Sequence, residues 1–589
     1  MSMEKIKNIY EKANIYVKML NLIKEGIGKY FFLIIFINIL ISTKLALSTY
    51  YHKTIIDTVS KIPINMDLAF KTLFVLWILE IFILVFNELS AYIKTIIKYR
   101  IDYTISKRIT DKMAKIKVEV MENIEIYDLL DRVNSNVPTG IADTILLIID
   151  VFLNIFKIIS FSFVLINIKW YFPIVSILTS IPYLFVLSKQ GFDTYIMQVA
   201  QNKNTRKLNY LFEILTNRVY SKEIRTFNLI DFLVEKIYKI RKTIWDEKIE
   251  LIYKHSRWTI YINILKNISI GICLFITCID VIQKRTSLGS VVLVISAIQN
   301  MIYSATFIMQ YIAKINKQVF YINDFNKFIL MPEEEDTLQK SISNFKIVCE
   351  NISFSYPNTS YQSLDNINLT INENEIIAIV GENGSGKTTF INLLLGIFKP
   401  TSGAIYVGDR ELPTIINEFR KKSVCIFQNF IRYQFTVEEN INAGNFGQKN
   451  RLKSFYAKTF LDFVNKLPFG YNTELGQLEN GSIELSGGEW QKIAICRALC
   501  REDLKLIILD EPMSALDPKV ESDLYHEFRD LCKNKQAIMI SHRLGATKVC
   551  DRIYVFDKGK IIENGTHEEL IKKGGKYYKM YKAQQSLYV

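Results

Sequence analysis

Cysteine is scarce in this chain, at 8 of 589 residues, and its spacing does not suggest a metal site. Cys496 and Cys500 are four residues apart on a predicted helix, but no other cluster of ligand residues accompanies them. We therefore interpret them as small buried side chains. Cys273 and Cys278 lie in an apolar stretch.

Motifs that would read nucleic-acid bases are also missing, although the chain is basic. Lys and Arg total 73 against 59 Asp and Glu, which gives a formal net charge of +14. Without a base-reading motif, this excess is typical of the lysine-rich cytoplasmic face of a membrane protein. We therefore expect no nucleic-acid partner.

Long apolar runs are absent after about residue 320, but they fill the sequence before it. Hydrophobic residues make up 49% of the chain, and the mean hydropathy of +0.14 is unusual for a wholly soluble protein. A membrane-crossing helix needs roughly 20 mostly apolar residues. Six runs qualify, at 30–47, 69–89, 144–168, 171–187, 261–282 and 288–312. The first run is too long for a cleavable signal and has no small-residue cleavage site.

The loops between these runs alternate in length. Residues 90–143 and 188–260 form long loops that are rich in Lys and Arg, whereas the other loops are short. Positive charge favours the cytoplasmic side, so the long loops and both termini are predicted in the cytoplasm. Helical periodicity in the long loops predicts that spans two to five continue as helices outside the membrane.

A change of composition beside Met331 and Pro332 divides the chain. Residues 1–320 are predicted to form an α-helical transmembrane domain with six membrane helices. Residues 321–344 are predicted to form a linker. Strand and helix patterns alternate over 345–589, which predicts an α/β domain of the kind that holds a phosphate-binding loop.

Residues 381–388 read Gly-Glu-Asn-Gly-Ser-Gly-Lys-Thr, which is a complete phosphate-binding loop. A strand-like run precedes it and a helix-like run follows it, as the motif requires. Its glycines let backbone N–H groups approach phosphate oxygens. Lys387 is expected on the β and γ phosphates of ATP, and Thr388 on Mg²⁺. The other nucleotide-binding residues expected here are Gly381, Asn383, Gly384, Ser385, Gly386 and Thr389.

An apolar run at 506–509 ends in two carboxylates, Asp510 and Glu511. Asp510 is expected to hold Mg²⁺, directly or through water. Glu511 is expected to accept the proton of the attacking water as a general base.

About a hundred residues after the phosphate loop, residues 485–489 read Leu-Ser-Gly-Gly-Glu. This is the signature of ABC ATPases, and residues 345–589 resemble the nucleotide-binding domain of the ABC transporter family. The resemblance implies that Tyr356 stacks on adenine. It also implies that Gln428 senses Mg²⁺ and the attacking water, and that His542 contacts the γ-phosphate.

In that family, the signature of one domain completes the ATP site of another. The resemblance therefore implies that Ser486, Gly487 and Gly488 grip the γ-phosphate of a second domain's ATP, aided by a helix N-terminus. Asp517 belongs to the loop that couples the two sites. Glu489 stands where the signature often has Gln, and we expect at most a modest effect.

The chain carries one copy of each motif, so the resemblance implies a dimer. The partner is either a second copy of this chain, giving two competent sites, or a different chain; the sequence leaves both open. Because a domain that uses cytosolic ATP faces reducing conditions, its cysteines are not expected to form disulfides.

Six predicted spans ahead of one ATPase resemble the half-transporter layout of type IV ABC exporters. Residues 126–130 and 222–227 are expected to be coupling helices between the membrane and ATPase parts. Residues 473–485 are similar to a loop of lantibiotic and small-peptide exporters. Those exporters usually have an aromatic pair where this chain has Leu478 and Glu479.

Ionisable residues within the predicted spans are expensive in hydrocarbon and usually face a cavity or a partner. They are Lys44, Glu80, Asp150, Lys157, Lys266 and Asp280. For Glu80 two hypotheses stay open. It either lines the translocation cavity and favours a cationic cargo, or forms a structural pair with a Lys on another span.

Together these features predict an ATP-driven exporter in the bacterial cytoplasmic membrane, with its ATPase domain in the cytosol and with ATP and Mg²⁺ as cofactors. The expected cargo is a small peptide, modified or unmodified, or another amphipathic molecule. A lipid flippase or multidrug exporter is one alternative, and a type IV importer or sensing component is another.

Overall fold

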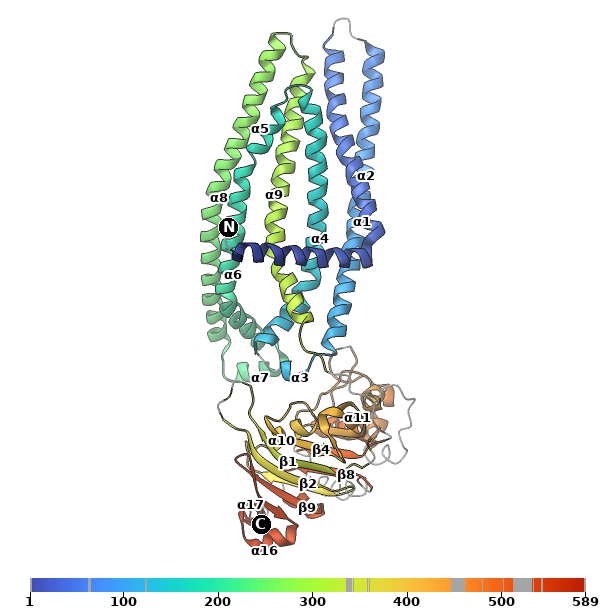
Figure 1. Ribbon diagram of the computed structural model, residues 1–589, viewed down its shortest axis with the longest axis vertical. Coiled ribbons are helices and arrows are strands. Elements are labelled where there is room, and N and C mark those ends of the chain that lie inside the picture. The colour runs from blue at the N-terminus through green and yellow to red at the C-terminus, as the bar shows by residue number, and fades with distance from the viewer. Residues whose placement is uncertain are drawn as a thin grey trace. The chain divides into compact units, whose positions relative to one another are not determined.

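The computed structural model describes residues 3–61, 65–121, 124–334, 342, 344–357, 359, 361–445, 461–478, 480–501, 503–511, 532, 534–541 and 544–586. The chain forms two compact units. The first comprises Met1–Lys115 and Ile124–Met331, and the second comprises Ile116–Asn123 and Pro332–Val589. Figure 1 shows helices in the first unit and sheets with short helices in the second.

The first unit is helical throughout its described elements. These are α1 (Met3–Val59), α2 (Met66–Met113), α4 (Ile124–Ile166), α5 (Phe172–Leu178), α6 (Ile181–Thr216), α7 (Arg218–Thr226), α8 (Ile230–Ile282) and α9 (Gly289–Ile329). Six helical segments in the described residues are long and apolar enough to cross a membrane, which confirms the six predicted spans. In each, only 17% to 44% of the most apolar window is buried, so much apolar surface faces outward as lipid contact requires.

Helices α4 and α9 pack against each other (Figure 1). Gly140 of α4 permits this approach, because a Cβ there would lie 2.6 Å from the ring of Tyr321 on α9. Helices α2 and α8 extend well beyond the apolar runs, as their periodicity predicted. Helix α9 also continues past residue 320, where we expected the membrane domain to end, as far as Ile329.

The described residues of the second unit form two sheets. The larger has the strand order β10 (Lys560–Gly565), β9 (Arg552–Asp557), β3 (Ile376–Gly381), β8 (Gln536–Ile540), β7 (Leu506–Asp510) and β6 (Ser423–Ile426). The smaller has the order β2 (Leu364–Ile371), β1 (Ile347–Phe354), β4 (Ser402–Val407) and β5 (Arg410–Glu411). Strand β3 pairs in parallel with β8 and β9, and β7 pairs in parallel with β6 and β8.

Short helices accompany these sheets. They are α3 (Val118–Met121), α10 (Lys387–Leu394), α11 (Ile416–Lys422), α12 (Val437–Asn442), α14 (Gly487–Leu499), α16 (His567–Lys573) and α17 (Lys576–Gln585). Helix α3 belongs to the second unit although it lies between α2 and α4 in sequence. The stretch 126–130, expected to be a coupling helix, instead lies in the first turns of α4 in the first unit.

The central strands are buried on both faces, which is why their sequences are continuous apolar runs and not alternating ones. Ile377 and Ile379 share one hydrophobic cluster with Phe390 of α10. Ala378 and Val380 point to the other face and share a cluster with Trp490 of α14. Side-chain alternation along β3 thus fixes the phosphate loop between two cores.

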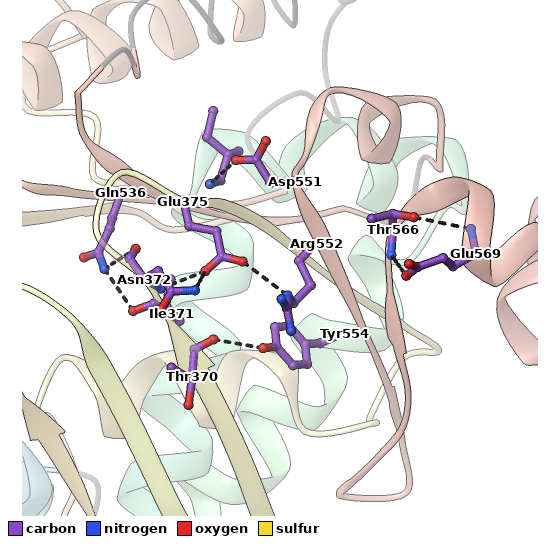
Figure 2. A network of polar contacts seen from close by, with 11 residues as sticks. Thr370, Ile371, Asn372, Glu375, Gln536, Asp551, Arg552, Tyr554, Thr566 and Glu569 are labelled. Atoms are coloured by element: carbon purple, nitrogen blue, oxygen red, sulfur yellow. Dashed lines mark hydrogen bonds and ion pairs between the residues drawn. The ribbon is translucent and has the colours of Figure 1, made fainter.

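A polar network ties together the amino ends of these parallel strands (Figure 2). The carboxylate of Glu375 accepts two hydrogen bonds from Asn372 and pairs with Arg552 at 3.2 Å. Gln536 donates to the backbone oxygen of Asn372 at 2.8 Å, and Asp551 accepts from the backbone N–H of Ile376 at 2.9 Å. This network lies where β3, β8 and β9 begin. It therefore stabilises the end of the sheet opposite the phosphate loop.

Candidate ATP site

The phosphate loop runs from the carboxyl end of β3 to the first residue of α10. Gly386 has φ +103°, and a Cβ at that position would lie 2.7 Å from Leu364 and 2.9 Å from the backbone oxygen of Ser363. Gly384 has φ +77°. Both positions therefore require glycine, as the motif predicted. Asn383 is exposed on the same loop.

Lys387 lies inside the loop and is only 6% exposed. Its ammonium donates to the backbone oxygens of Gly381 and Glu382 at 3.0 and 2.9 Å. Burial lowers the pKa of Lys387, and the nearby carboxylates of Glu511 and Asp510 oppose that shift. The buried hydroxyl of Ser385 has no hydrogen-bond partner among the described residues. A phosphate oxygen is the acceptor that both donors suit.

Asp510 ends β7 and is 3% exposed. Burial raises the pKa of this carboxyl, while the hydrogen bond from Thr388 and the charge of Lys387 oppose the shift. The hydroxyl of Thr388 donates to the Asp510 carboxylate at 3.3 Å. A hydroxyl oxygen and a carboxylate oxygen so close together match the ligands that Mg²⁺ prefers, so the residues present fit this ion.

Glu511 follows Asp510 and has the positive φ of +51°, which is rare for a residue other than glycine. Its backbone N–H is held by the oxygen of Ile540 at the end of β8. Gln428 donates its amide to the Glu511 carboxylate at 2.8 Å. The sequence predicted both residues in the site, but not this contact, because nothing in either motif records the turn geometry that joins them.

Tyr356 follows β1 and is half-buried beside the phosphate loop. Its ring packs edge-on against Phe354 and Phe398, and its hydroxyl lies 3.3 Å from that of Thr389. This contact connects the residue expected to bind adenine with the first turn of α10.

Ser486 is the N-cap of α14, and Gly487 and Gly488 form the first turn of that helix. The N–H and the hydroxyl of Ser486 both donate to the Glu489 carboxylate, at 2.8 and 2.7 Å, while the Glu489 N–H donates back at 3.3 Å. This reciprocal arrangement is a capping box. Glu489, which stands where the signature often has Gln, thus has a structural role that sequence reasoning missed.

Two of the predicted site residues, His542 and Asp517, lie outside the described residues, as does Glu479 of the loop before the signature. Within the described part of the second unit, the structure brings together Lys387, Thr388, Asp510, Glu511 and Gln428. It also places Tyr356 beside the same loop.

Comparison with known proteins agrees with this geometry. Residues 364–514 match the model of the ABC transporter family. The chain is 31% identical over 507 residues to the subtilin transport ATP-binding protein SpaT of Bacillus subtilis, covering 84% of this chain and 82% of that protein. It is 26% identical over 526 residues to the nisin transport ATP-binding protein NisT of Lactococcus lactis subsp. lactis, covering 86% of each.

A solved structure of a bacterial Atm1-family ABC exporter with ATP bound has the same fold. It superposes with a TM-score of 0.81 and covers 95% of this chain and 98% of that one, at 18% sequence identity.

Proposed function

The chain belongs to the ABC transporter family as a type IV exporter half-transporter, and on that premise we propose that two copies of it use ATP to export a small peptide. It is a multi-pass membrane protein with a cytosolic ATPase domain that couples ATP hydrolysis to transport. Peptide cargo is supported by the subtilin and nisin transport proteins, which match most of this chain.

The contact between Gln428 and Glu511 is the observation that carries the hydrolytic part of the proposal. Lys387 and the loop N–H groups bind the β and γ phosphates. Thr388 and Asp510 would hold Mg²⁺, which supplies charge neutralisation on the phosphate oxygens. Glu511 then accepts the proton of the attacking water, and Gln428 keeps its carboxylate directed at that water.

The second half of each site comes from a second copy of the chain. Its Ser486, Gly487 and Gly488 present the N-terminus of α14 to the γ-phosphate. The Ser486 hydroxyl, which donates to Glu489 in this chain, turns to the phosphate when the dimer closes. Asp517 and His542 complete the site in this proposal.

Closure of two ATPase domains on ATP drives the membrane helices to open outward, and hydrolysis at Glu511 resets them. ATP shifts this equilibrium because it binds the closed dimer more tightly than the open one. Helix α7 and the segment that contains α3 are the elements we assign to transmit closure.

The test is ATPase activity of the full chain in lipid nanodiscs, wild type beside Glu511→Gln. We expect stimulation by peptide fractions from the source cell and its loss in the variant. A response to lipids or drugs but to no peptide would contradict peptide export. Flux of the stimulating peptide into inside-out vesicles establishes direction, and flux the other way would identify an importer.

A further inference from the structure

The ionisable residues of the membrane helices are not all paired. Asp150 on α4 pairs with Lys94 on α2. Asp280 on α8 pairs with Lys169 at 2.9 Å and lies 3.8 Å from Arg285. Each of these carboxylates thus has a cation beside it. Of the three acids named in the predicted spans, Asp150 and Asp280 are therefore paired within this chain.

Of the two hypotheses that the sequence left open for Glu80, the structure bears on the structural pair with a lysine. It forms no ion pair with any residue that the structure describes, and it is exposed on α2 in the single chain. The lysine that α1 contributes, Lys44, instead has its ammonium 3.2 Å from the ring centroid of Phe82. A structural Glu–Lys pair at Glu80 is thus not formed within the described residues.

Lys266 on α8 is a buried cation of these helices. It is 6% exposed, and its ammonium donates to the hydroxyl of Thr306 on α9 at 2.7 Å. It lies 4.1 Å from the ring centroid of Tyr183 on α6. No carboxylate in the described part of the chain pairs with it. An ammonium carries three hydrogen-bond donors, but among the described residues Lys266 has one acceptor, a neutral hydroxyl. The buried charge is therefore incompletely satisfied within the chain.

The groups around Lys266 are also rich in donors. The Tyr183 hydroxyl accepts from Gln310 of α9 at 3.2 Å, and the Thr306 hydroxyl accepts from Lys266. Among the described residues, neither hydroxyl has an acceptor for its own hydrogen. Three helices thus bring together one cation and two hydroxyl groups that have no acceptor among the described residues. A ligand that satisfies them must bring negative charge and several acceptor oxygens, as a carboxylate does.

The position along the helices suits cargo loading. Lys266 lies 16 residues before the end of α8 at Ile282, which is roughly 24 Å along the helix axis from its outer end. The hydrocarbon core is about 30 Å thick. The site therefore lies toward the cytoplasmic side of the membrane, where an exporter receives its cargo.

We propose that Lys266, with Tyr183 and Thr306, forms an anion-binding subsite that takes a carboxylate of the peptide cargo. This inference rests on the proposed function and specifies the charge of the group that the exporter recognises. It differs from the cavity hypothesis for Glu80, which favours a cationic cargo.

The experiment measures binding of one synthetic apolar peptide to the full chain in nanodiscs without ATP. The peptide is prepared with a free C-terminal carboxylate, with a C-terminal amide, and as the amide with one internal Glu. We expect the wild type to bind a carboxylate form about tenfold more tightly than the amide. Comparing the first and third forms tells whether the terminal or a side-chain carboxylate is recognised.

Lys266→Met should remove the preference without changing the affinity for the amide peptide, which shows that the variant is folded. Lys266→Arg should retain most of the preference, because it keeps the positive charge. Lys44→Met is the matched control: it removes a lysine of the same membrane region that stacks on Phe82, and should leave the preference intact.

Equal affinity for all peptide forms, unchanged in Lys266→Met, would overturn the subsite while leaving peptide export standing. Binding of anionic lipid vesicles that depends on Lys266, without any preference for carboxylate peptides, would also overturn the subsite. The recognised anion would then be a lipid phosphate. If no peptide binds and none stimulates ATP hydrolysis, the proposed function itself fails.

Discussion

At the scale of single residues, the ATP site holds charged groups in positions where burial opposes their charge. Burial raises the pKa of Asp510 and lowers the pKa of Lys387, yet each stabilises the charged form of the other. Glu511 adds a backbone conformation that is rare outside glycine. Charged groups with shifted pKa values are typical of functional sites, where bound nucleotide and cation can stabilise them.

Gln428 should act as a positioning residue for Glu511. We expect Gln428→Ala to lower kcat about tenfold to hundredfold, the range found for partners that orient catalytic groups, with little change in KM for ATP. Gln585→Ala removes an exposed side chain of the same type and should change neither parameter. A large rise in KM with kcat unchanged would show that Gln428 serves nucleotide binding instead.

The pKa of Asp510 predicts how hydrolysis depends on pH. Because burial raises this pKa, the carboxyl takes up its proton at a higher pH than an exposed Asp, whose pKa is about 4. Mg²⁺ binds the deprotonated form, so protons and metal compete. Activity should fall as pH decreases, and more free Mg²⁺ should move this fall to lower pH. A fall at the same pH for every Mg²⁺ concentration would contradict Asp510 as the metal ligand.

At the scale of elements, three helices described in the second unit each begin with a capping box. Thr436, Ser486 and Thr566 each cap a helix and form a reciprocal pair with a Glu three residues later. The pair at Thr566 and Glu569 is visible in Figure 2. The box at Ser486 differs in function, because its hydroxyl is also the one assigned to the γ-phosphate.

This repetition supplies a matched pair of variants. Ser486→Ala and Thr566→Ala should each lower the free energy of unfolding by about 1 kcal/mol, the usual cost of a lost N-cap. Only Ser486→Ala should also abolish most ATP hydrolysis. Chemical denaturation of the purified full chain measures the free energy of unfolding, and release of inorganic phosphate measures ATP hydrolysis. Equal loss of hydrolysis in both variants would mean that Ser486 acts through helix stability alone.

Local sequence predicts elements well where backbone geometry demands particular residues. Gly384 and Gly386 have positive φ, and the apolar runs of β3 and β7 are buried on both faces, so motif and periodicity locate them. The sequence predicts the first coupling stretch at 126–130; these residues lie in α4, and the segment that groups with the second unit is 116–123. Helical periodicity runs through both, so it cannot tell a short separate helix from the start of a long one.

Contacts between distant segments could not be predicted in the same way. The hydrogen bond from Gln428 to Glu511 and the donor-rich surroundings of Lys266 depend on which helix faces or turns meet in three dimensions. The six spans and the polar residues within them are evident in the sequence. The side chains with which those polar residues pair are not. The pairing of Asp150 with Lys94, and the absence of such a pair at Glu80 in the described residues, required the structure.

At the scale of the whole molecule, one chain carries one phosphate loop and one signature helix, both in its second unit. In the proposed dimer, each functional ATP site lies between Lys387 of one copy and Ser486 of another. Two kinds of purified heteromer, built with different affinity tags, distinguish this arrangement from a site within one chain.

In the first heteromer, one protomer carries Lys387→Met and its partner carries Ser486→Ala. In the second, a wild-type protomer is joined to one that carries both substitutions. We predict that the first heteromer hydrolyses ATP, because one of its sites keeps both groups. The second should not, because each of its sites has lost one group. Hydrolysis by the second heteromer and none by the first would contradict ATP sites shared between two copies.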